Sequence, residues 1–182
     1  QATCFNCVIE NHQTQAYNLA RRMLNDWALA EDAVQESFVS AYRAFDRFRG
    51  ENLTAWMLRI VSNTCRDMLR ARKARPSVSL DPLPTGDGDE PQGLSALDIP
   101  SDGPTPEDQA EQLELRETIQ AGLDTLQEDQ RLAVLLVDVH GMSYEEASQS
   151  MGCSLGTVKS RVIRGRGGLR DYLRQAEELL PS

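Results

Sequence analysis

Residues 143–170 read SYEEASQSMGCSLGTVKSRVIRGRGGLR, and this stretch predicts two helices separated by a tight turn. Ser143 and Glu146 form a capping-box pattern, which opens a short helix. Gly152 then ends that helix, and Ser154 is a suitable N-cap for the next one. A short helix, a turn containing glycine and a second helix together indicate a helix-turn-helix.

The second of these helices carries a block of positive charge. Residues 155–174 include six basic residues and one acidic residue, and their apolar residues recur at helical spacing. A recognition helix lies in the major groove, where arginine pairs with guanine and other cations meet phosphates. We therefore predict DNA contacts for Thr157, Lys159, Ser160, Arg161, Arg164 and Arg166. Ser160, Arg161 and Arg164 are the candidates for reading bases, whereas capping of its own helix is an alternative role for Thr157.

Three glycines follow the base-reading candidates in this helix. Gly165, Gly167 and Gly168 each cost about 1 kcal/mol relative to alanine in a helix interior. We therefore expect a firm helix from Leu155 to Arg164 and a frayed or bent tail from Gly165 onward.

The composition of the 182-residue chain is that of a soluble helical protein. Hydrophobic residues make up 40% and charged residues 26%, and the formal net charge is -9. Helical periodicity recurs throughout, whereas the apolar–polar alternation of strands is absent, so we predict an all-α fold. No apolar run is long enough to cross a bilayer and no signal-peptide pattern is visible, so we expect a cytoplasmic protein without membrane insertion.

The charge is distributed unevenly along the chain. Residues 57–75 again contain six basic residues and one acidic residue, whereas residues 77–130 contain fourteen acidic residues and one basic residue. Seven of the eight prolines lie between positions 76 and 106. We therefore predict two small helical domains, residues 1–75 and 111–182, joined by an acidic flexible linker over 76–110. Two basic patches suit a polyanionic partner, and solvated helix faces are the alternative reading.

The basic segment before the linker predicts a helix over residues 55–72. Its inward stripe includes Met57, Val61 and Met68. Its opposite face has the spacing i, i+4, i+7, i+11 and i+14, occupied by Arg59, Asn63, Arg66, Arg70 and Lys73. Four of these five residues are cationic, which is typical of a surface that follows a nucleic-acid backbone.

The loop before this helix is flanked by two aromatic residues. Phe48 and Trp56 bracket residues 49–54. Packing in the core is the simplest role for both rings, and stacking on an unpaired base is the alternative.

The residues with reactive side chains are sparse. Cys4 and Cys7 invite a zinc or redox interpretation, but no second pair with metal-ligand spacing exists, and His12 and His140 are isolated. No catalytic triad, phosphate-binding loop or apolar carboxylate pair is recognisable. We therefore expect no metal site, no cofactor and no enzymatic activity.

Two blocks of the chain carry a family resemblance. Residues 30–75 resemble region two of the bacterial extracytoplasmic-function (ECF) sigma factors of the sigma-70 family, and residues 126–173 resemble region four. With the helix around residues 15–24, these blocks cover most of the chain outside the predicted linker. The resemblance implies a subunit that binds RNA polymerase core, directs it to promoters and helps to open the DNA.

The resemblance also assigns roles to residues. The residues that it implies for contact with the clamp helices of the largest polymerase subunit are Asp32, Gln35, Glu36 and Val39. The residues that it implies for binding the minus-ten element and melting the DNA are Phe48, Arg49, Asn52, Trp56, Arg59, Asn63, Arg66 and Arg70. The loop over 49–54 would capture a flipped base, and the helix from Leu155 would read the minus-thirty-five element. The implied partners are promoter DNA, the polymerase core including its flap, and an anti-sigma factor.

Two other functions are compatible with parts of the sequence. A free-standing helix-turn-helix regulator would bind duplex DNA without polymerase. A thiol-based redox enzyme would use Cys4 and Cys7. Binding to polymerase core distinguishes the sigma factor from both.

Overall fold

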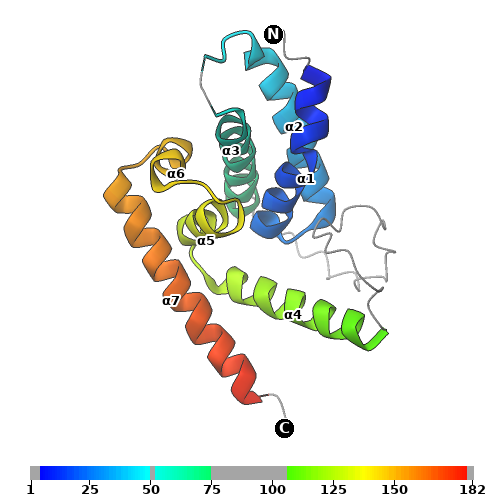
Figure 1. Cartoon of the computed structure of the whole chain (residues 1–182), viewed down its shortest axis with the longest axis vertical. Coiled ribbons are helices and arrows are strands. Elements are labelled where there is room, and N and C mark those ends of the chain that lie inside the picture. The colour runs from blue at the N-terminus through cyan, green and yellow to red at the C-terminus, as the bar shows by residue number, and fades with distance from the viewer. Residues whose placement is uncertain (1–4, 50–51, 75–105, 180–182) are drawn as a thin grey trace.

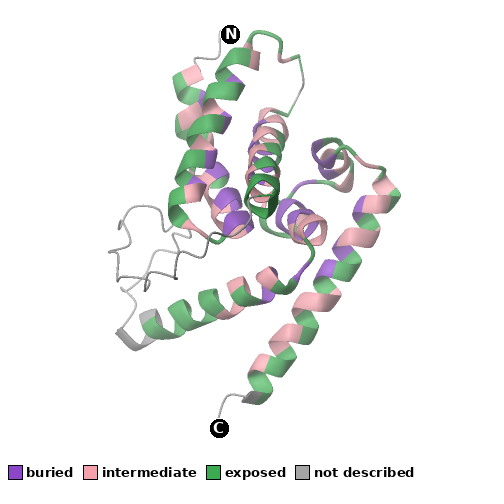
Figure 2. Cartoon of the chain, turned by 180° about the vertical axis from the view of Figure 1, so that it is seen from behind, coloured by how far each residue is buried: buried purple, intermediate pink, exposed green. Residues whose placement is uncertain are grey.

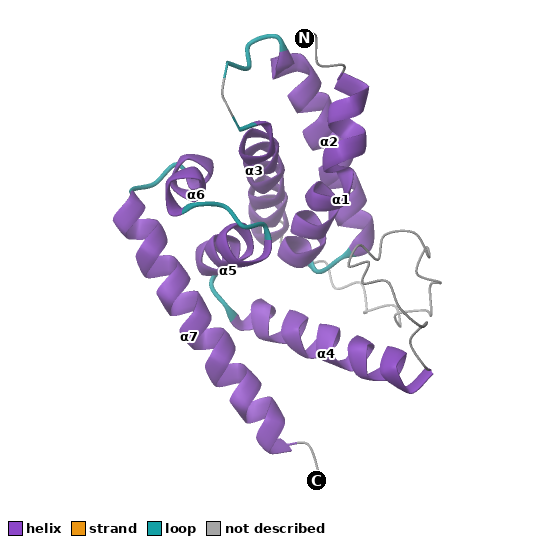
Figure 3. Cartoon of the chain, viewed as in Figure 1, coloured by secondary structure: helices purple, strands orange, loops and turns teal. Residues whose placement is uncertain are grey.

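The chain is helical throughout the residues that the structure describes, which are 5–49, 52–74 and 106–179. The computed structural model contains no strand in these ranges, so the predicted all-α fold is confirmed (Figure 3). In chain order the elements are α1 (Phe5–Leu24), α2 (Trp27–Phe45), α3 (Leu53–Ala74), α4 (Pro106–Thr125), α5 (Glu128–Val134), the π-helical turn η1 (Leu135–Val139), α6 (Tyr144–Met151) and α7 (Leu155–Leu179).

Helices α1, α2 and α3 pack against one another as a three-helix bundle, which we call the N-terminal unit (Figure 1). Its interior contains large side chains from α1 and α3, including Met23, Leu58 and Val61. Helix α2 contributes small residues such as Ala30 and Ala33, which allow its backbone to lie close to the other two helices. The opposite face of α2 therefore stays exposed.

Helices α4 to α7 form the C-terminal unit, in which α7 packs against α4, α5 and α6 (Figure 1). The predicted capping box is present at the start of α6, where the Ser143 side chain accepts from the Glu146 N–H. Gly152 ends α6 with a φ of 63°, in the left-handed region that glycine adopts without strain. The Thr157 N–H donates to the Ser154 hydroxyl at 3.2 Å. These features confirm the helix-turn-helix.

The predicted fraying of α7 after Arg164 is wrong, because α7 continues without interruption to Leu179. The glycines lie where other helices come closest. A Cβ on Gly165 would lie 2.6 Å from Val134 Cγ2, and one on Gly168 would lie 2.7 Å from Leu126 Cδ2. Close packing of α7 against this part of the unit therefore stabilises glycines that a free helix would not tolerate well.

The two units pack against each other through α3 and α6. Buried residues of both units belong to one continuous hydrophobic cluster, as the purple segments that meet between the helices in Figure 2 illustrate. Helix α4 begins at Pro106, inside the range 76–110 that was expected to be linker, and the rest of that range up to position 105 lies outside the described residues. Within the described ranges, no helix has the length and apolar character required to cross a membrane.

The glycines of α7 give a stability prediction. Gly165→Ala places a methyl group against Val134 and the Gln130 carbonyl oxygen, whereas Gly167→Ala meets no atom within 4 Å. Both variants gain about 1 kcal/mol of helix propensity, and G165A alone incurs an overpacking cost of about 1–3 kcal/mol. Urea unfolding should therefore find G165A less stable than G167A by about 1 kcal/mol or more. Equal stability of the two variants would contradict close packing at Gly165.

Candidate nucleic-acid interface

The exposed face of α7 carries three of the cations that the sequence predicts for DNA contact. Lys159, Arg164 and Arg166 are exposed. The Lys159 ammonium lies 5.9 Å from the centre of the Tyr144 ring on α6. Arg166 donates to both carboxylate oxygens of Asp138, and this hydrogen bonding raises the pKa of Arg166 above its usual value. Asp138 therefore holds the Arg166 guanidinium in the free chain.

The other three predicted contacts on α7, like Arg166, have hydrogen-bond partners within the protein. The Thr157 hydroxyl lies 2.8 Å from that of Ser154, consistent with the capping role considered for it. The Ser160 hydroxyl donates to the Thr157 carbonyl at 2.9 Å. Arg161 donates to Asp129 and to the Cys153 sulfur. In this arrangement, Arg164 is the most available of the three base-reading candidates.

One exposed residue of α7 was missed by the sequence analysis. Ile163 is 69% exposed, and neither charge nor capping pointed to it. Its position four residues after Lys159 is the signal that places both on the outer face. An exposed apolar side chain on such a helix suits contact with the methyl group of thymine.

The polar face of α3 is divided between solvent and the C-terminal unit. Arg59, Asn63 and Arg70 are exposed, and Arg70 pairs with Asp67 on its own helix at 3.0 Å. The Arg66 side chain is only 12% exposed and donates to the Asp129 carboxylate at 2.7 Å. The fifth member of the face, Lys73, pairs with Glu128 at 3.0 Å.

The start of α3 lies beside α6. Asn52 caps α3 by accepting from the Ala55 N–H at 2.9 Å, and its amide also donates to Glu146. The backbone N–H of Ser143, and then Asn52, hold the pKa of Glu146 below its usual value. Arg49 donates to the carbonyl oxygens of two preceding residues, at 2.6 and 3.0 Å.

The two predicted aromatic residues at this loop lie against each other. The ring centres of Phe48 and Trp56 are 5.0 Å apart, and both side chains are half-buried. Phe45 extends the contact to the core side, with its ring 6.4 Å from that of Trp56. The pair therefore joins the hydrophobic interior to the loop, of which residues 50 and 51 lie outside the described ranges.

A separate exposed face lies on α2, away from the basic helices. All four residues predicted for polymerase contact are exposed, and their spacing places them on one side of the helix: Asp32, Gln35, Glu36 and Val39. Tyr42, which the sequence analysis did not single out, extends this face by a turn and is 67% exposed. The face combines carboxylates with apolar surface, which is typical of a protein-docking surface.

An open groove of about 520 Å³ lies between α4 and the C-terminal half of α7. Its apolar lining includes Ile119, Leu123, Val134, Leu169 and Leu173. Its charged lining consists of four arginines and two carboxylates, namely Arg22, Arg166, Arg170, Arg174, Asp138 and Glu177. This shape and composition fit an amphipathic helix with acidic flanks.

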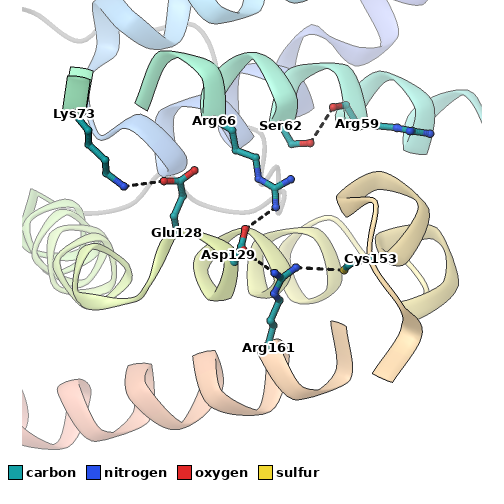
Figure 4. Close-up of polar contacts among 8 residues, drawn as sticks. All are labelled: Arg59, Ser62, Arg66, Lys73, Glu128, Asp129, Cys153 and Arg161. Carbon is teal, nitrogen blue, oxygen red and sulfur yellow. Dashed lines mark hydrogen bonds and ion pairs between the residues drawn. The ribbon is translucent and has the colours of Figure 1, made fainter. Parts of the chain in front are cut away.

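Asp129 connects the two basic helices. Figure 4 shows its carboxylate between Arg66, which descends from α3, and Arg161, which rises from α7. Glu128 lies one residue earlier in the same turn of α5 and reaches Lys73. The sequence analysis assigned Arg66 and Arg161 to DNA without detecting this common partner.

The cysteine pair considered for zinc or redox chemistry is only partly described. Cys4 lies outside the described residues, and Cys7 is exposed on α1. Cys65 is buried, and burial raises the pKa of its thiol to about 12. In the described ranges, no group of three histidine, cysteine or acidic side chains is arranged to hold a metal ion.

Comparisons with known proteins agree with this arrangement. A family model described as Sigma-70 region 2 matches residues 8–75, and one described as Sigma-70, region 4 matches residues 116–167. The chain is 36% identical over 166 residues to the ECF RNA polymerase sigma factor SigE of Mycolicibacterium smegmatis. The matched segment covers 91% of this chain and 60% of that relative. It is 34% identical over 164 residues to the ECF RNA polymerase sigma-E factor of Salmonella typhimurium. This match covers 89% of this chain and 82% of that relative.

Solved structures include similar folds. The sigma factor RpoE of Bartonella quintana, in complex with the anti-sigma factor NepR, has a TM-score of 0.67 and 27% identity, covering 93% of this chain and 96% of that one. CnrH, in complex with the cytosolic domain of CnrY, has a TM-score of 0.65 and 25% identity. The match covers 94% of this chain and 88% of CnrH. The chain therefore belongs to the sigma-70 family, as an extracytoplasmic-function sigma factor.

Proposed function

We propose that the chain binds RNA polymerase core, directs it to specific promoters and promotes DNA opening at the start of transcription. The observation that carries this proposal is the presence, in one chain, of both matched sigma regions with a cationic helix in each. Sigma factors are transcription initiation factors, and we propose that this one has no enzymatic activity of its own and acts in the cytoplasm, where it meets the polymerase.

For the minus-thirty-five element, we propose that α7 enters the major groove. Arg164 is exposed near the N-terminal half of the helix, where recognition helices contact bases, so it is our first candidate for bidentate pairing with guanine. Ile163 beside it would contact a thymine methyl group, and Lys159 and Arg166 would bind phosphates. Thr157, Ser160 and Arg161 would support or extend these contacts after exchanging their present partners.

For the minus-ten element, we propose that α3 tracks the backbone through Arg59, Asn63 and Arg70, with Arg66 joining them when the C-terminal unit moves away. Phe48 and Trp56 already lie against each other at the start of α3, with their ring planes tilted by 44°, and an unpaired base would stack on this aromatic pair. Arg49 and Asn52 would hold the flipped nucleotide beside it. Flipping costs a few kcal/mol, which contacts to the open strand must offset.

Polymerase core would bind at two places. The exposed face of α2 would dock on the clamp helices, where the carboxylates of Asp32 and Glu36 complement cationic surface and Val39 supplies apolar contact. The groove between α4 and α7 would accept a helix of the polymerase flap. An anti-sigma factor would control access to these surfaces, as the complexes of RpoE and CnrH suggest by analogy.

Removal of one base-reading side chain tests the role of α7. Arg164→Ala should lower run-off transcription from cognate promoters by about tenfold, because a lost bidentate pair costs about 1–3 kcal/mol. Arg116→Ala is the control, since it removes the same charge from an exposed position on α4. Unchanged promoter use by R164A, or equal losses in both variants, would contradict base reading by Arg164.

Charge reversal on α2 tests the core-docking face. Glu36→Lys should weaken binding to purified polymerase core by about tenfold or more, because it places a cation opposite the surface that the carboxylate complements. Binding can be measured by fluorescence anisotropy of the labelled chain. Glu10→Lys makes the same charge change on the exposed side of α1 and should bind as the wild type does. A chain that binds operator DNA tightly while ignoring core would be a free-standing regulator instead.

A further inference from the structure

The two helices that we propose for promoter binding face a common acidic pair in the free chain. Glu128 and Asp129, which we call the acidic clasp, occupy the first turn of α5. Asp129 accepts from Arg66 of α3 and Arg161 of α7, and Glu128 accepts from Lys73 of α3 (Figure 4). The clasp therefore holds three cations, and each of them belongs to a helix with a proposed DNA role.

The chemistry of these contacts resembles that of a phosphate. A carboxylate offers two anionic oxygens to guanidinium and ammonium groups, as a phosphodiester does. The Asp129 side chain divides its two oxygens between two arginines. DNA that approaches α3 or α7 therefore competes with the clasp for the same donors.

The packing of the C-terminal unit against α3 also keeps DNA away from part of that helix. Arg66 is only 12% exposed, and α6 packs against α3 near the loop, where the Ser150 hydroxyl donates to the Ala55 carbonyl at 3.3 Å. The amide of Asn52 donates to Glu146. Duplex or single-stranded DNA cannot lie along this part of α3 while the C-terminal unit occupies it.

The interface between the N-terminal and C-terminal units, which we call the seam, includes several polar contacts. Such contacts suit reversible docking. Arg131 donates to the Met23 carbonyl at 3.0 Å, and Gln120 donates to the Arg22 carbonyl at 3.3 Å. The Asp129 side chain remains 44% exposed, so salt and competing anions reach the clasp. The polar part of the seam is therefore sensitive to ionic strength, and core and DNA must also outweigh the apolar contacts of the shared hydrophobic cluster.

We propose that the acidic clasp is an internal latch, which holds the chain in a closed form and occupies promoter-binding cations until polymerase core and promoter DNA displace it. This inference rests on the proposed function. It assigns to Glu128 and Asp129 an autoinhibitory role exerted within the chain itself, without an anti-sigma factor. Opening exchanges three ion pairs with carboxylates for contacts with phosphates, so the balance depends on core, DNA and ionic strength.

Carbodiimide crosslinking reports the closed form directly. The chain has two lysines, and one of them, Lys73, lies 3.0 Å from the Glu128 carboxylate. The reagent adds to the carboxyl to give an O-acylisourea, and the lysine amine then attacks its carbonyl carbon to form an amide while a urea leaves. No spacer is inserted, so the crosslink requires direct contact. Mass spectrometry should find the Lys73–Glu128 amide in the free wild-type chain and lose it when core and promoter DNA are added.

A matched pair of variants tests the latch. Asp129→Asn removes the bridge between Arg66 and Arg161, whereas the control Asp67→Asn makes the same charge change on α3 and releases Arg70 without touching the seam. D129N should lower the crosslink yield by about fivefold or more, and D67N should retain the wild-type yield. Run-off transcription at limiting sigma should be higher with D129N than with D67N by a similar factor. Circular dichroism confirms that both variants are folded.

Each outcome decides a different point. Equal crosslink yields and equal transcription in D129N and D67N would show that the seam is a fixed interface and overturn the latch. Transcription lower with D129N than with D67N would show that Asp129 serves the active form, and would also overturn it. A Lys73–Glu128 crosslink that persists in the wild type with core and DNA bound would show that the clasp does not open, and would overturn the latch as well. If the wild-type chain supports no transcription with core, the proposed function fails, and the crosslink still reports whether the clasp opens in D129N.

Discussion

A single carboxylate, that of Asp129, joins the two halves of this chain, which also share one hydrophobic cluster. It lies between Arg66 and Arg161, which come from helices separated by the whole acidic middle of the sequence. Because a half-buried guanidinium needs an anionic partner, removal of Asp129 would leave Arg66 with a desolvated and unpaired charge. The position of α5 between the two basic helices therefore follows from electrostatics as much as from the shared hydrophobic cluster.

The rigidity of α7 depends on contacts that a helix-propensity argument does not include. Gly165 allows the α7 backbone to approach Val134 and the Gln130 carbonyl so closely that no side chain fits between them. The recognition helix consequently projects from the unit as one straight element, with its exposed cations on the outer face and one wall of an apolar groove at its far end. The same helix thus carries both the surface that we propose for DNA and one wall of the groove that we propose for a protein partner.

Local signals in the sequence predicted most of the helices and part of the interface. Capping at Ser143 and Ser154, the turn at Gly152 and the spacing of apolar residues are all short-range features, and each is confirmed. The continuity of α7 was not predictable in this way, because the packing that stabilises Gly165 comes from α5. Likewise, the partners of Arg66 and Arg161 lie 63 and 32 residues away in sequence, so charge counts alone assigned both arginines to DNA. The residues that the resemblance assigned to polymerase contact are all exposed on α2, where their helical spacing places them on one side.

Together these features describe a sigma factor in which three cations of the two basic helices are paired with internal carboxylates, while other cations of the same helices are exposed. The central claim is that this chain initiates transcription from promoters with two separated elements, and run-off transcription over a random promoter library with purified polymerase core tests it most directly. The account predicts enrichment of templates that share two short sequence elements at a fixed spacing, one read by α7 and one by α3. Transcription no greater than that of core alone, or enrichment of a single element without a fixed partner, would contradict it.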